Sequence, residues 1–167
     1  MASQPEAWQR GPLPGVDPYL MPAAHALVQA GEDLEVVAGL SPEQLLARPG
    51  GAASLDFHLR HLAAATERLL TYARGRRLAP EQLARAAAEQ EAATSPDAAV
   101  LVAEVRESLE DVLAEIRATP RERLLEPREV GRQRLPSNVL GLLGHIAEHA
   151  ARHVGQIVTT TRLVRSR

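Results

Sequence analysis

The sequence contains no cysteine and no lysine, and these two absences exclude several kinds of chemistry. Without cysteine the chain has no disulfide, no thiolate metal site and no cysteine nucleophile. Without lysine it has no Schiff-base nucleophile and lacks the lysine of a phosphate-binding loop. Aromatic residues make up only 2% of the chain, so the core must consist of aliphatic side chains and alanine.

Long apolar runs and a strong net charge are also missing. No apolar run approaches the roughly 20 residues of a membrane span, and no signal-peptide pattern opens the chain, so we expect a cytoplasmic protein with no membrane partner. The net charge is −2, and residues of both signs are interspersed, which argues against a nucleic-acid partner. A chain of 167 residues with 45% apolar residues is typical of one globular domain.

The first 20 residues differ in composition from the rest. They include four prolines and two glycines, which disfavour a helix or a central strand. We therefore expect an extended arm over residues 1–20, tied to the body by Trp8, Leu13, Tyr19 and Leu20. Residues 21–167 are expected to form a single domain.

Four segments show apolar residues at helical spacing, over about 22–39, 54–74, 95–119 and 137–164. Ser54 and Ser137 are the expected N-caps of the second and fourth helices, and Ser95-Pro96-Asp97 begins the third. A short polar helix is expected over about 80–91, and no segment is a convincing strand. The pattern predicts an all-α fold, a four-helix bundle, and its long later connections imply at least one crossover.

The fourth helix carries three histidines on its apolar stripe, at positions 145, 149 and 153. Residues four apart on a helix lie on one face, so His149 and His153 can bind the same metal ion. His145 and His153 lie about 12 Å apart along the axis, so one ion cannot bind all three histidines. A third ligand must come from another helix.

The second helix offers His58 and His61, and helical geometry does not choose between them. His58 lies nearer the centre of the apolar stripe, and His61 lies on its flank. His25, on the first helix, is expected at the bundle edge or exposed. A buried histidine is often only a satisfied core residue, but several imidazoles inside an apolar bundle need polar partners, and a metal would supply them.

The segment from His145 to His149 also matches the inverted zinc-protease motif, with Glu148 as the base. That protease fold is far larger and needs a carboxylate ligand further along the chain. No aspartate or glutamate follows His149, which argues against this interpretation.

Two runs, residues 54–63 and 148–157, resemble the DinB/YfiT-like superfamily of metalloenzymes, and the likeness extends from about residue 22 to residue 164. The resemblance implies a bundle of up-down-down-up topology and one divalent metal ion bound by His61, His149 and His153. Zinc or nickel is expected first, with manganese or iron as alternatives. His58 and His145 then become residues that line the site.

The resemblance also bears on activity, because some relatives are dimers and some are S-transferases or isomerases that use bacillithiol, mycothiol or a related small thiol. It implies a metal-dependent transferase acting on a small-molecule substrate. The sulfur nucleophile must arrive as a co-substrate, since the chain has no cysteine. A hydrolase using metal-bound hydroxide is one alternative, and a non-catalytic stress-response bundle with a structural metal is another.

Ligand imidazoles usually donate their second nitrogen to a carboxylate or a carbonyl. Glu67 and Glu148 are the candidate carboxylates, and Gln156, one turn beyond His153, is a candidate to hydrogen-bond a bound ligand or to bridge helices. The fourth helix is also apolar on its reverse side, which needs cover either from the N-terminal arm and the short helix or from a second copy. We expect a homodimer. The reverse-side residues are Leu140, Ala147, Ala151, Val154 and Val158.

Overall fold

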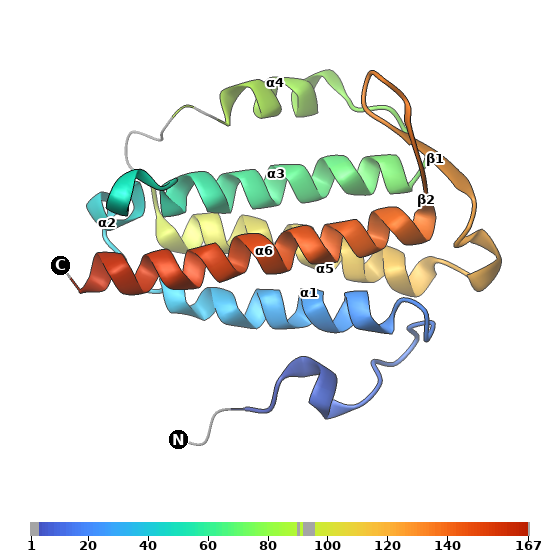
Figure 1. Cartoon of the computed structure of the whole chain (residues 1–167), viewed down its shortest axis with the longest axis horizontal. Coiled ribbons are helices and arrows are strands. Elements are labelled where there is room, and N and C mark those ends of the chain that lie inside the picture. Colours follow the sequence, from blue (N-terminus) through green and yellow to red (C-terminus); the bar gives the residue numbers. More distant parts are fainter. Residues whose placement is uncertain (1–3, 90, 92–95, 167) are drawn as a thin grey trace.

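A computed structural model describes residues 4–89, 91 and 96–166 of the chain. Within these residues, four long helices form a bundle, which confirms the all-α prediction (Figure 1). They are α1 (Met21–Asp33), α3 (Leu55–Ala73), α5 (Ala98–Ala118) and α6 (Val139–Arg165).

The helices follow the up-down-down-up order that the resemblance implied. α1 and α6 run in one direction, and α3 and α5 run in the other (Figure 1). α3 packs against both α5 and α6, and α1 packs against α6. The short helix α4 (Pro80–Ala88) runs back along the outside of α3, so that α5 can start at the same end as α3 (Figure 1). This return is the crossover, and it places α4 beside a helix that carries two histidines.

The connections contain short elements. α2 (Pro42–Leu46) and two 3-10 helices (Leu34–Val37 and Pro49–Gly51) join α1 to α3, and another 3-10 helix (Arg121–Arg123) follows α5. A small antiparallel hairpin, β1 (Pro127–Val130) with β2 (Leu135–Asn138), then precedes α6, and Val130 lies opposite Leu135. The sequence did not predict this hairpin, because each strand has only four residues and contains a proline, Pro127 in β1 and Pro136 in β2.

The helix starts test the expected caps. The Ser54 hydroxyl accepts a hydrogen bond from the Phe57 backbone N–H at 3.2 Å, as predicted. The prediction for Ser137 is wrong, because Ser137 belongs to β2 and Asn138 caps α6 by accepting from the Gly141 N–H at 2.7 Å. Asn138 is the last residue with extended backbone angles, which an N-cap requires. α5 is capped by Asp97, and Ser95 lies outside the described residues.

Only two of the four side chains that were expected to tie the N-terminal segment to the bundle are buried or packed against the core. Leu20 is fully buried and Leu13 packs against the core, whereas Trp8 and Tyr19 are 63% and 64% exposed. A 3-10 helix (Ala7–Arg10) replaces part of the expected extended arm, and Ala7 is buried. His25 lies at the edge of the bundle and its Nε2 hydrogen-bonds the Gly11 carbonyl at 2.9 Å.

Part of the reverse face of α6 is covered within the chain. Ala147 and Val154 are buried in the bundle, while Ala151 is exposed. The homodimer stays a prediction, and a second copy is needed to cover only the part of the reverse face of α6 that the chain itself leaves exposed. Among the described helices, none combines the length and the hydropathy that a bilayer crossing requires.

Candidate metal centre

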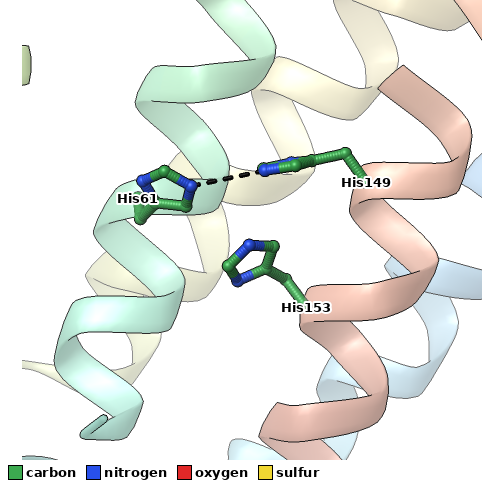
Figure 2. Close-up of side chains that lie close together, drawn as sticks. All are labelled: His61, His149 and His153. Carbon is green, nitrogen blue, oxygen red and sulfur yellow. Dashed lines mark hydrogen bonds between the residues drawn. The ribbon is translucent and has the colours of Figure 1, made fainter. Parts of the chain in front are cut away.

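Three histidines from two helices converge inside the bundle. His61 on α3 faces His149 and His153 on α6 (Figure 2). One ring nitrogen from each of them lies within 4.8 Å of the others, and the Nε2 atoms of His61 and His149 are 3.3 Å apart. Ligand nitrogens around a tetrahedral ion with bonds of 2.0–2.1 Å are about 3.3 Å apart. The spacing therefore suits a divalent ion.

The helix packing explains this convergence. His149 and His153 are one turn apart on α6, and their ring centroids are 4.5 Å apart. The ring of His61 lies 5.2 Å from that of His149 and 4.8 Å from that of His153. α3 and α6 pack directly against each other, so a flank position such as His61 reaches the face of α6. All three side chains are half-buried.

His61 is held from two sides. The ring of Phe57 stacks on it, with centroids 5.4 Å apart and planes 10° apart. On its other side, Nδ1 lies 2.7 Å from Oε2 of Glu89, the residue that follows α4. A carboxylate only accepts hydrogen bonds, so Nδ1 carries the proton and Nε2 keeps its lone pair for a metal.

Glu89 is itself buried and paired. Its second oxygen forms an ion pair with Arg68, which lies about two turns after His61 on the same face of α3. Burial pushes the pKa of Glu89 upward, but the hydrogen bonds from Arg68 and His61 outweigh burial and hold the pKa below its usual range. The carboxylate is therefore charged at neutral pH.

His153 has a different partner, a fourth histidine. Nδ1 of His153 lies 3.0 Å from Nδ1 of His58, which is buried on α3. This contact occupies Nδ1 of His153 and leaves its Nε2 for a metal. Burial, and after it the nearby His61, lower the pKa of His58, so that its ring is neutral and can accept a hydrogen bond.

The electrostatics favour neutral ligands. Burial, followed by the neighbouring imidazoles, lowers the pKa of His149 to about 4 and that of His153 to about 4. Both rings are thus unprotonated at pH 7, with a lone pair available for a metal. Nδ1 of His149 is buried and has no hydrogen-bond partner among the described residues.

The structure leaves the other expected residues out of the three-histidine group, although the ring centroid of His145 lies 6.1 Å from that of His149. His145 is exposed, and its Nδ1 lies 3.4 Å from Glu148, which pairs with Arg152. His145 is not part of the three-histidine group found among the described residues, so the protease pattern does not form a metal site. Gln156 is exposed.

The carboxylate beside the ligands is not the one expected from the sequence. Glu67 hydrogen-bonds Gln82 at 3.1 Å and Arg85 at 2.8 Å, on the surface of α4. Glu89, which the sequence analysis missed, lies against His61 instead. One signal for it existed in the sequence, since Glu89 is seven residues after Gln82 and the two share a face if helical geometry continues past residue 88. In the structure both side chains are buried.

Comparison with known proteins shows the family to which the chain belongs. The model of the DinB superfamily matches residues 26–157, a stretch that begins in α1, ends in α6 and includes all three clustered histidines. No protein of curated function matches the chain.

Proposed function

The chain belongs to the DinB superfamily, and from this membership we propose that it is a divalent-metal-dependent enzyme whose metal ligands are His61, His149 and His153. The observation that carries the proposal is the meeting of three imidazole nitrogens within 4.8 Å. The Nδ1 atoms of His61 and His153 are occupied by Glu89 and His58, which leaves the Nε2 atom of each ring to bind a metal.

The donor set suits zinc or nickel. Imidazole nitrogens are borderline ligands, which zinc and nickel bind well and which the harder magnesium and calcium ions bind poorly. Among the described residues no fourth histidine or carboxylate joins the group, which supports an open coordination position. An ion bound by three neutral imidazoles keeps its double charge and lowers the pKa of a water or thiol in that position.

We further propose that the reaction uses a low-molecular-weight thiol as co-substrate, in a transferase or isomerase reaction. The chain has no cysteine, so a sulfur nucleophile has to come from solution. The half-buried histidines are accessible from the surface, with 22% of the His61 side chain exposed. A divalent ion in the site would stabilise a bound thiolate and so lower the pKa of the thiol.

Metal binding is tested by reconstituting the purified protein with zinc and nickel and measuring the metal content after desalting. We expect about one ion per chain. His153→Ala should abolish binding and keep the helix content, whereas His145→Ala, a change on the same helix outside the cluster, should bind as the wild type does. Failure of the wild type to retain either ion would refute the proposed metal site.

Thiol binding is tested with the cobalt(II)-substituted protein, because a cobalt–thiolate bond gives an intense near-ultraviolet absorption band. Bacillithiol and mycothiol are the probes, and alcohols of similar size are the controls. A band that appears with a thiol in wild-type protein and in His145→Ala supports the thiol co-substrate. An unchanged spectrum at millimolar thiol would leave the metal site standing and refute the thiol reaction.

A further inference from the structure

The end of α4 contacts the metal-ligand cluster directly. Glu89, 28 residues after His61 in the sequence, bridges His61 on one oxygen and Arg68 on the other. It is only 8% exposed, although most of α4 is open to solvent. Further polar contacts between α4 and α3 are made by Gln82, which donates hydrogen bonds to Glu67 and to Thr71, and by Arg85, which donates to Glu67.

Burying a carboxylate is unfavourable unless charged or hydrogen-bonding partners compensate it. Arg68 alone would supply the charge. The second oxygen, however, is 2.7 Å from His61 Nδ1, a short contact typical of a bond with an ionised acceptor. The carboxylate is therefore shared between a structural ion pair and the imidazole that faces the other two histidines.

We propose that Glu89 is a positioning residue that links the docking of α4 to metal binding through His61. This inference rests on the proposed metal site. Glu89 fixes the Nδ1–H tautomer and the ring orientation of His61, which strengthens metal binding at Nε2. By thermodynamic reciprocity, a bound metal strengthens the docking of the α4 end onto α3 by the same factor.

The chain offers a matched control for this link. Glu67 is also a carboxylate between α3 and α4, but it contacts Gln82 and Arg85 and no histidine. Glu67→Gln weakens the docking of α4 without touching the cluster, whereas Glu89→Gln keeps the shape and removes the charge that holds His61. Comparing the two variants separates a link through His61 from simple loosening of α4.

The first measurement is zinc affinity, by competition with a chromophoric chelator. Removing an outer partner of a ligand histidine typically weakens metal binding by about 10–100-fold. We expect a loss in this range for Glu89→Gln and a change below about 3-fold for Glu67→Gln. Equal losses in the two variants would overturn the proposal.

The second measurement is amide hydrogen exchange in α4 with and without zinc. Wild-type protein and Glu67→Gln should both gain protection in α4 on adding zinc, and Glu89→Gln should not. A gain of wild-type size in Glu89→Gln would show that α4 is not linked to the metal through this carboxylate.

The third measurement needs neither a variant nor a metal. Long-range ¹H–¹⁵N correlation spectra of the metal-free wild type should show His61 protonated at Nδ1. An Nε2–H tautomer would refute the positioning role directly. If the wild type binds no metal, the proposed function fails, and the tautomer still decides whether Glu89 holds His61.

Discussion

Replacing His58 by leucine separates the requirements of the metal site from those of the core. His58 is 6% exposed, and its Nδ1 is the partner of His153 Nδ1 at 3.0 Å. When His153 binds a metal through Nε2, its Nδ1 must carry a proton and needs an acceptor, which the neutral His58 provides. His58→Leu removes that acceptor and should weaken zinc binding by about 10–100-fold, or about 1.4–2.7 kcal/mol.

The stability of the metal-free protein should behave differently. Leucine fills a comparable volume and carries no polar atom, so the free energy of unfolding in the presence of a chelator should stay within about 1.5 kcal/mol of wild type. Zinc affinity is measured by chelator competition at pH 7 and stability by urea unfolding, with His145→Leu as the exposed control. Wild-type zinc affinity in His58→Leu would refute the reasoning, as would a loss of affinity matched by an equal loss of metal-free stability.

Two further predictions concern the frame that carries the site. Asn138→Ala should destabilise the protein by about 1 kcal/mol in urea unfolding because it removes the cap of α6, whereas Ser137→Ala should change little; equal effects would contradict the cap assignment. Arg121, through its hydrogen bond, lowers the pKa of Asp17, so this pair stabilises the fold above about pH 4 and loses its contribution as the pH falls through the folded-state pKa. The stability difference between wild type and Asp17→Asn should shrink accordingly in acid, and a difference that grows would be inconsistent with the pair.

The four long helices were predictable because their apolar residues repeat at helical spacing over many turns. The stripe of α5 shows this, since Val105, Val112 and Ile116 are all fully buried. Boundaries were less certain, and the start of α6 moved by one or two residues. Ser137 and Asn138 are both good caps, and only the backbone geometry after β2 decides between them.

The hairpin between α5 and α6 illustrates a different limit. Residues 127–130 and 135–138 are too short to show a period of two, and Pro136 removes a backbone donor from one strand. The pairing is reinforced by contacts outside the hairpin, such as the hydrogen bond from Arg128 to the Ala73 carbonyl at the end of α3. Such contacts depend on how the bundle ends meet, which no local pattern contains.

Two kinds of information were needed to place the histidines. The spacing of His149 and His153 follows from one helix and was available from the sequence. Helical geometry left His58 and His61 open, and the family resemblance, now supported by the superfamily match, favoured His61. In the structure both histidines contact the pair: His61 joins His149 and His153 in the three-histidine group, and His58 contacts Nδ1 of His153. The contact between Glu89 and His61 depends on the direction in which α4 docks on α3, which the sequence does not show. Proximity in the sequence therefore favoured Glu67 as the carboxylate beside His61.

The long separation between the two halves of the cluster bears on when a cation can be captured. His61 and His149 are 88 positions apart, so bringing them together closes a large loop, whose length-dependent entropic cost is about 4 kcal/mol. Packing of α3 on α6 through the aliphatic interior compensates that cost before any ion arrives. Before the bundle forms, only the locally spaced pair His149 and His153 among the three ligands can meet on one ion, so tight metal binding requires the folded protein. The metal-bound protein should therefore resist unfolding more than the metal-free protein.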